Sequence, residues 1–184
     1  MKTLLIVRHG EAARGEDDRE RALTPVGRQQ SSELGQLLRQ RSYVPDLALC
    51  SPARRAKETW REVAAAFGYS VQKRVVEEMY PGEPAELLAA VARVPAAVAT
   101  LMLVGHHPGL HLLASTLAAS GEADALAALQ SGLPTAGCAV VSFDGGWEGR
   151  WEGLSGGTLA RFIVPRFVAP RVPASGAGPE PNRN

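Results

Sequence analysis

The sequence has only two cysteines, almost no net charge and no long run of apolar residues. Cys50 and Cys138 stand far apart and form no closely spaced pair, so we expect no disulfide framework and interpret both as small core residues. A formal net charge of +1 argues against a broad basic surface for nucleic acid. The apolar run near the N-terminus is too short for a signal peptide or a membrane span. We therefore expect a cytoplasmic protein that binds neither nucleic acid nor membrane.

Short apolar segments alternate with helical patterns along most of the 184 residues, a length that suits one domain with a substantial core. Strand patterns cover residues 2–7, 45–50, 71–76, 99–105, 138–144 and 158–164. Helix patterns cover residues 24–40, 51–67, 83–93 and 108–119, and each begins at or next to a proline. This alternation predicts an α/β fold: a three-layer α/β/α sandwich with a mostly parallel central sheet. A Gly/Trp-rich turn joins the last two strands, so we expect an antiparallel pair at the edge of the sheet.

The C-terminal end differs in composition from the rest of the chain. From Pro165 onward, proline, glycine and serine recur without any apolar periodicity. We predict a domain over residues 1–166 and a disordered Pro/Gly-rich tail over residues 167–184.

Histidine and arginine side chains follow the carboxyl ends of three predicted strands. Arg8 and His9 come directly after the first strand. His106 follows the fourth strand, and Arg55 lies in the first turn of the helix after the second strand. In an open parallel sheet such ends meet at one edge, where ligands bind. Because arginine matches phosphate oxygens and neutral imidazole is a nucleophile, the arrangement favours chemistry on a phosphoryl group.

Four sequence blocks in this order carry a family resemblance: "LIVRHGEA", "LTPVGRQQ", "SPARRAKET" and "VGHHPGL". The chain resembles the histidine phosphatase, or phosphoglycerate-mutase-like, superfamily over roughly residues 2–165. Its short length and the ending "GTLARFIVP" are similar to the SixA-type phosphohistidine phosphatases. The resemblance implies that His9 attacks phosphorus and carries the phosphoryl group, that Arg8 and Arg55 hold it, and that His106 stabilises its developing charge. It implies no metal and no cofactor.

Two further residues are expected to face the substrate. Arg21 matches a basic position before the LTxxG block of SixA-like relatives, and the alternative is a surface charge. Many phosphomonoesterases of this superfamily carry a carboxylic acid after the third strand, and Glu78 is the best positional match for it. Glu77 and Glu83 are also available, and all three could be loop charges.

The weak match at this acid suggests a substrate class. Expelling an alkoxide requires a proton donor, whereas an imidazole can leave already protonated on its other nitrogen. The expected partner is therefore a protein that carries phosphohistidine, such as a phosphorelay domain. A small phosphorylated molecule on the same site, or a non-catalytic module that recognises phosphorylated partners, are the alternatives. A mutase is not expected because no segment is available to close over a retained product.

Other interpretations of the site residues remain at this point. His9 could be a buried structural histidine, and Arg55 could pair with Glu58 or Glu62 instead of phosphate. His107 and His111 have a spacing that metal ligands use on helices, but nothing nearby completes a ligand set. A role for His107 in the pocket stays open.

Overall fold

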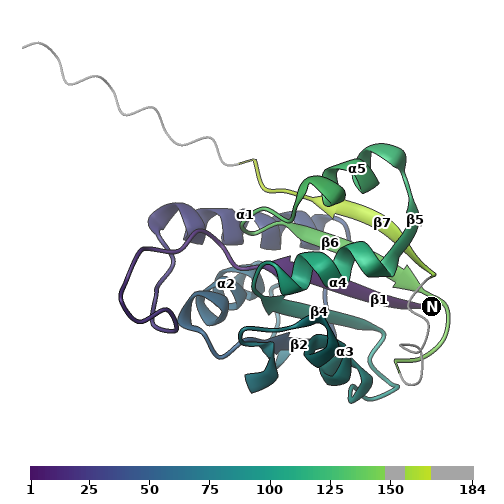
Figure 1. The fold of residues 1–184 in the computed structure, drawn as a ribbon, viewed down its shortest axis with the longest axis horizontal. Coiled ribbons are helices and arrows are strands. Elements are labelled where there is room, and N and C mark those ends of the chain that lie inside the picture. Colours follow the sequence, from purple (N-terminus) through teal and green to yellow (C-terminus); the bar gives the residue numbers. More distant parts are fainter. Residues whose placement is uncertain (148–155, 167–184) are drawn as a thin grey trace, which may run out of the picture.

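The computed structural model describes residues 1–147 and 156–166. The predicted tail over residues 167–184, and most of the turn between the last two predicted strands, lie outside the described residues. Helices cover both faces of one central sheet, so the predicted three-layer α/β/α sandwich is confirmed (Figure 1).

Seven strands form this sheet within the described residues, in the order β3-β2-β4-β1-β6-β7-β5. β1, β4 and β2 pair in parallel at the centre, β3 is parallel to β2, and β5 is parallel to β7. β6 runs antiparallel to both of its neighbours, β1 and β7. The strands are β1 (Lys2–Arg8), β2 (Leu47–Cys50), β3 (Gln72–Val75), β4 (Thr100–Gly105), β5 (Ala118–Gly121), β6 (Cys138–Phe143) and β7 (Gly157–Ile163).

The helices divide between the two faces. One face packs against α1 (Pro25–Gln40) and α2 (Arg54–Ala65), and the other packs against α3 (Pro84–Ala92), α4 (Gly109–Leu117) and α5 (Ala123–Ser131). The four apolar residues in the middle of β1 explain this arrangement, because successive side chains point to opposite faces. Leu5 and Val7 are buried under α1 and α2, whereas Leu4 and Ile6 are buried in the other cluster. A strand covered on both faces therefore reads as a continuous apolar run.

The end of the sheet differs from the expectation. The antiparallel pair of β6 and β7 is present, but β7 is not the last strand. The predicted fourth helix ends at Leu117, and the next four residues form β5 along the outer side of β7. α5 follows β5 and has no counterpart among the predicted helices.

The start of α1 shows why the helix boundaries were predictable. Thr24 is the N-cap, its side-chain oxygen accepts the N–H of Gly27 at 3.0 Å, and Pro25 occupies the first helical position. None of the helices in the described ranges combines the length and the apolar character that crossing a membrane requires.

Candidate active site

The carboxyl end of β1 fixes the backbone of His9 from two sides. The N–H of His9 donates to the carbonyl of Gly105 at 3.0 Å, and its carbonyl accepts the N–H of Ala136 at 3.1 Å. The next residue, Gly10, packs so closely on α1 that a Cβ would lie 2.5 Å from the carbonyl oxygen of Gly27. Its N–H donates to Thr59 Oγ1 of α2 at 2.9 Å. The imidazole is therefore presented by a backbone that the sheet and two helices hold in place.

The imidazole of His9 is poised as a neutral nucleophile. Nδ1 lies 2.7 Å from the carbonyl oxygen of Gly10, which can only accept, so Nδ1 carries the proton and Nε2 carries the lone pair. The pKa of His9 is lowered to about 4, mainly by burial and also by Arg55, Arg8 and Arg21, against the opposing effect of the Gly10 carbonyl. At neutral pH Nε2 therefore carries an unprotonated lone pair, the form in which an imidazole is a nucleophile.

Arg55 is buried, with 5% of its surface exposed, and lies between His9 and a carboxylate. Its Nε donates to His9 Nε2 at 3.2 Å. Its Nη1 donates to the main-chain carbonyl of Asp18, and its Nη2 donates to Asp18 Oδ2 at 2.9 Å. The guanidinium therefore forms its ion pair with Asp18 and not with Glu58 or Glu62.

His106 stands beside His9, with ring centroids 5.2 Å apart. Ser51 is fully buried, and its Oγ accepts the N–H of Ala53 at 3.3 Å and lies 2.7 Å from His106 Nε2, the one acceptor that the contacts of the described residues offer to the hydroxyl hydrogen. This pairing leaves the ring proton on Nδ1. The pKa of His106 is lowered to about 3, mainly by burial and also by His9 and Arg55, so this ring is neutral near pH 7 as well.

Two buried side-chain polar atoms have no hydrogen-bond partner among the described residues, and both belong to this site. They are Arg8 Nε and His106 Nδ1. Arg8 is otherwise held by a bond from Nη1 to the carbonyl of Leu133 at 2.9 Å. Buried donors are nearly always paired, so two unpaired donors beside a neutral nucleophile indicate a binding position for an anion.

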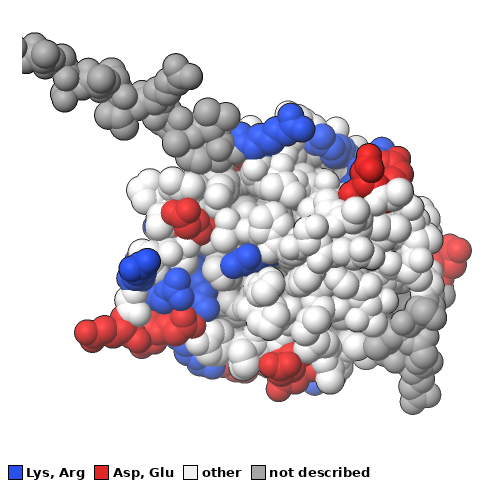
Figure 2. Space-filling view, turned by 45° about the horizontal axis from the view of Figure 1, so that its top comes forward, with Lys and Arg blue, Asp and Glu red and all other residues white. Residues whose placement is uncertain are grey.

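These side chains line a hollow of about 380 Å³. Charged side chains of both signs gather at the left of the face in Figure 2, and most of the remainder of that face is uncharged. A second, more open hollow of about 500 Å³ shares Arg8 and His107 with the first. The lining of the first hollow is Arg8, His9, Asp18, Arg21, Arg55, Tyr80, Pro81, Gly82, Glu83, His106, His107, Pro108 and Gly109.

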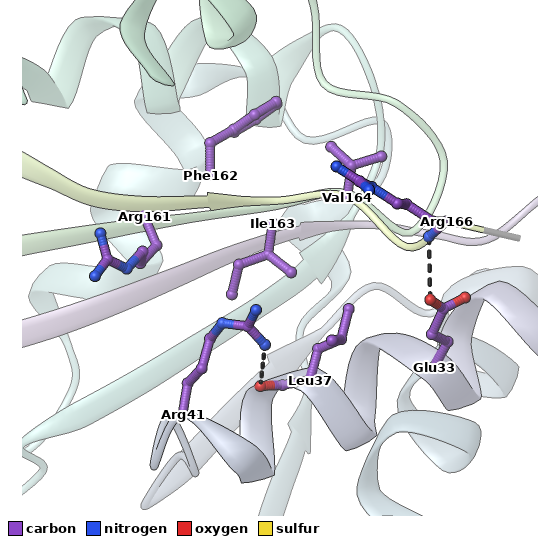
Figure 3. Close-up of a pocket in the computed structure, with 8 residues that line it drawn as sticks. All are labelled: Glu33, Leu37, Arg41, Arg161, Phe162, Ile163, Val164 and Arg166. Carbon is purple, nitrogen blue, oxygen red and sulfur yellow. Dashed lines mark hydrogen bonds between the residues drawn. The ribbon is translucent and has the colours of Figure 1, made fainter. Parts of the chain in front are cut away.

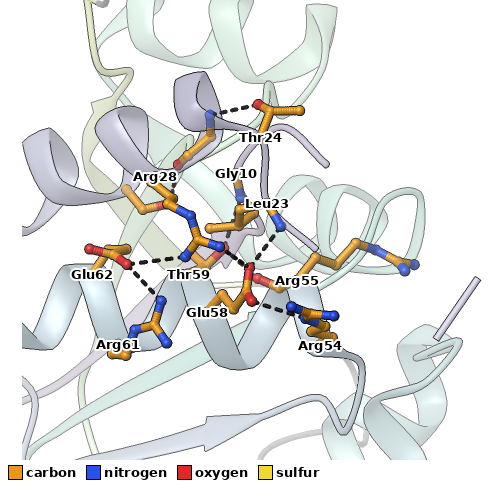
Figure 4. A network of polar contacts seen from close by, with 12 residues as sticks. Gly10, Leu23, Thr24, Arg28, Arg54, Arg55, Glu58, Thr59, Arg61 and Glu62 are labelled. Atoms are coloured by element: carbon orange, nitrogen blue, oxygen red, sulfur yellow. Dashed lines mark hydrogen bonds and ion pairs between the residues drawn. The ribbon is translucent and has the colours of Figure 1, made fainter. Parts of the chain in front are cut away.

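A carboxylate of α2 ties the segment after β1 to the two helices (Figure 4). Glu58 Oε2 accepts the N–H of Leu23 at 2.8 Å and Arg28 Nη2 at 3.1 Å, and Oε1 accepts Arg54 Nε at 3.0 Å. Burial would raise the pKa of Glu58, but the Leu23 N–H and the two guanidinium groups outweigh it and lower the pKa. This network fixes one end of the loop that carries Asp18.

The expected substrate-facing residues are placed differently from one another. Arg21 lines the hollow, with Nε on the carbonyl of Ala13 at 2.7 Å and Nη1 on Asp18 at 2.8 Å. Glu78 is not among the lining residues and pairs with Arg93 at 2.7 Å. Of the three glutamates considered from the sequence, Glu83 is the one in the lining.

His107 lines both hollows, but no metal set forms around it. Its ring stacks on that of His111, with centroids 5.6 Å apart. The described residues contain no group of three or more His, Cys, Asp or Glu side chains that could hold a metal ion.

A larger hollow of about 580 Å³ lies elsewhere, between α1 and the end of β7 (Figure 3). Arg166 N–H donates to Glu33 there at 3.1 Å, and Arg41 Nη1 donates to the carbonyl of Leu37 at 3.2 Å. Its lining contains neither histidine nor cysteine. Size alone would favour this hollow, but the neutral nucleophile and the unpaired buried donors identify the smaller one as the candidate active site.

Sequence reasoning missed two residues of the site, Asp18 and Tyr80. The Tyr80 hydroxyl donates to Asp18 Oδ2 at 2.6 Å, and its ring lies edge-on to His106 with centroids 5.3 Å apart. Asp18 lies in an irregular loop among other charged residues, and 62 positions separate it from Tyr80. The one indication in the sequence is that Asp18 and Arg21, which carry opposite charges, stand three residues apart and can form an ion pair.

The sequence pattern of the histidine phosphatase superfamily (branch 1) matches residues 4–87. An uncharacterized protein of Mycobacterium tuberculosis, Rv1276c, is 34% identical over 164 residues, which are 87% of this chain and 100% of that protein. The chain therefore belongs to the histidine phosphatase superfamily, and this membership supports a phosphatase activity.

Two solved structures are similar over nearly the whole fold, and both proteins are provisionally named phosphohistidine phosphatase SixA. The one from Nakamurella multipartitia is 31% identical with a TM-score of 0.78, covering 90% of this chain and 97% of its own. The one from Agrobacterium tumefaciens is 30% identical with a TM-score of 0.74, covering 89% and 98%. The resemblance to the SixA branch is thus confirmed.

Proposed function

We propose that this protein removes the phosphoryl group from phosphohistidine on another protein, through a covalent intermediate on His9. The observation that carries the proposal is the pair of unpaired buried donors, Arg8 Nε and His106 Nδ1, beside the neutral ring of His9. A phosphoryl group is an anion with oxygens for these donors and an electrophilic phosphorus for the ring.

In the first step His9 Nε2 attacks phosphorus in line with the bond to the substrate nitrogen. The N–P bond of the substrate breaks, and its electron pair returns to the substrate ring, which leaves neutral because its other nitrogen holds a proton. His9 keeps the proton on Nδ1, which continues to donate to the Gly10 carbonyl, and becomes a phosphorylated, positively charged ring. Arg8, Arg55 and His106 Nδ1 stabilise the phosphoryl oxygens.

In the second step water attacks the same phosphorus from the side that the substrate has left. The bond from phosphorus to His9 Nε2 breaks, and the ring recovers its lone pair and its neutral, Nδ1-protonated form. The protons of the water go to the released phosphate. No acid is needed to expel His9, because its Nδ1 already carries a proton, which donates to the Gly10 carbonyl, and the ring therefore leaves phosphorus as neutral imidazole.

The open pocket supports a substrate attached to a protein. The site hollow and the more open second hollow share Arg8 and His107 in their linings, so a bulky substrate has a second concave surface next to the phosphoryl position. The two solved proteins of about 30% identity also carry the name of phosphohistidine phosphatases.

A small-molecule phosphomonoesterase on the same site is the second candidate, and Glu83 favours it. Glu83 lines the pocket and is a carboxyl that could protonate an alkoxide leaving group. Glu83→Gln would then reduce turnover of phosphomonoesters strongly. On our proposal Glu83→Gln leaves phosphohistidine turnover within about threefold of wild type, because that leaving group needs no added proton.

The test compares phosphate release by wild type and His9→Ala from a phosphohistidine-bearing relay domain and from p-nitrophenyl phosphate. We expect fast release from the relay domain, slow release from the ester, and a loss of at least about a thousandfold in His9→Ala, since the nucleophile is absent. Binding of inorganic phosphate to His9→Ala serves as the control for an intact pocket.

Two other results would contradict the proposed function. Fast turnover of the ester without action on the relay domain would identify a small-molecule phosphatase. Phosphate binding without any His9-dependent release would leave a recognition module and would contradict the mechanism.

A further inference from the structure

Asp18 projects a carboxylate into the pocket and contacts three side chains there. Oδ2 accepts Arg55 Nη2 at 2.9 Å and the Tyr80 hydroxyl at 2.6 Å. Oδ1 accepts Arg21 Nη1 at 2.8 Å. Arg21 holds the carboxylate from the same loop, and Arg55 and Tyr80 hold it from two distant segments of the chain.

The carboxylate still has capacity for one more donor. Its two oxygens offer about four lone-pair positions, and three are used, so one position on Oδ1 is left. The side chain is 48% exposed and belongs to the lining of the pocket. The Tyr80 hydroxyl, Arg21 and Arg55 hold the pKa of Asp18 well below its usual range, so Asp18 is an acceptor and not an acid near neutral pH.

The guanidinium of Arg55 separates Asp18 from the nucleophile. Its Nε end faces His9 Nε2, and both of its Nη atoms face Asp18. A phosphoryl group bound along Arg55 therefore has His9 towards one end and the Asp18 carboxylate towards the other. In-line displacement puts the leaving group opposite the nucleophile, which is the side of Asp18.

We propose that Asp18 is a specificity-determining residue that accepts the N–H of the departing imidazole of phosphohistidine. This inference rests on the proposed function. The contact keeps the distal nitrogen of the substrate ring protonated, so the ring leaves as neutral imidazole when His9 Nε2 forms its bond to phosphorus and the N–P bond breaks. In the same way, the Gly10 carbonyl accepts the N–H of the distal nitrogen of His9, Nδ1.

The same carboxylate acts against ester substrates. An alkoxide or phenolate leaving group develops negative charge and presents no N–H, so a fixed anion at this position opposes its departure. One residue thus favours one leaving group and disfavours the other.

The experiment compares kcat/KM of wild type and Asp18→Asn on a phosphohistidine-bearing relay domain and on p-nitrophenyl phosphate. We expect a loss of about a hundredfold on the relay domain. The change on the ester is expected to be at least tenfold smaller, because there the loss of an opposing charge offsets the disturbance of Arg55. The alkaline limb of the relay-domain pH profile should also move to lower pH in Asp18→Asn, since the substrate ring then loses its proton more easily.

Asp17→Asn is the matched control. Asp17 is exposed, and its side chain accepts only the N–H of Arg19 at 2.9 Å among the contacts of the described residues, so both rates should match wild type. Equal losses on both substrates in Asp18→Asn would overturn the inference and mean that Asp18 only positions Arg55. Faster turnover of both substrates would also overturn it and mean that Asp18 competes with the phosphoryl group for Arg55. A wild type without action on the relay domain would instead overturn the proposed function, so the two failures are distinguishable.

Discussion

His9 and His106 are both neutral at the working pH because the fold removes them from water. Burial is the largest cause of the lowered pKa of each ring, and the neighbouring guanidinium groups act in the same direction. The bonds to Gly10 and Ser51 then decide which nitrogen of each ring holds the proton. A chemically ordinary residue thus becomes a nucleophile at Nε2 in one case and a hydrogen-bond donor at Nδ1 in the other.

Titration of the His9 ring tests whether burial keeps it neutral. We expect ring NMR signals of the free protein to report a neutral imidazole from neutral pH down to a midpoint of about 4, compared with about 6.5 for an exposed histidine. A His9→Ala spectrum assigns the signals. A midpoint near 6.5 would mean that the ring is solvated and charged more easily than its burial implies.

The same shift affects stability. Because the folded-state pKa lies below that of the unfolded chain, the unfolded chain takes up protons first as the pH falls. The free energy of unfolding should therefore decrease as the pH falls from about 6.5 to about 4.

Helix α2 organises the site more than any other single element. It contributes Arg55 directly, Thr59 to hold Gly10, and Glu58 to hold Leu23. Its first turn follows β2, so these side chains meet the carboxyl end of β1. The loop that carries Asp18 is thereby attached at the element that also carries its partner Arg55.

Removal of the Glu58 carboxylate tests this role of α2. Glu58→Ala leaves the Leu23 N–H and the Arg28 and Arg54 guanidinium groups without their partner, so we expect a loss of about 2–3 kcal/mol in the free energy of unfolding. Urea denaturation measures it. The control is Glu62→Ala on the same helix, whose carboxylate contacts Arg28 at 3.5 Å and Arg61 at 3.0 Å near the surface, with an expected loss below about 1 kcal/mol. Equal losses would show that the Glu58 network is not special.

Over the whole molecule, the predictable features were those that repeat locally. β1 reads as a buried strand because Leu4 to Val7 are all apolar, and α1 is marked by Thr24 and Pro25. The meeting of His9, Arg55 and His106 at one edge follows from the parallel strands that precede them.

The features that sequence patterns missed depend on tertiary contacts. β5 consists of two alanines, a serine and a glycine, so its extended form comes from pairing with β7 and not from its own preference. Asp18 has no periodic context, and its contacts reach 37 positions to Arg55 and 62 to Tyr80. The role of such a loop residue can be identified only from the tertiary structure, which shows the distant side chains that it contacts.

The most direct test of the central claim is to locate the phosphoryl group during turnover. Wild-type protein is mixed with an excess of a labelled phosphohistidine-bearing relay domain, quenched under alkaline conditions at early times, and mapped by peptide mass spectrometry. We expect a transient label on His9 that decays as phosphate appears, and neither label nor turnover in His9→Ala. A label on another residue, or phosphate release that continues in His9→Ala, would contradict it.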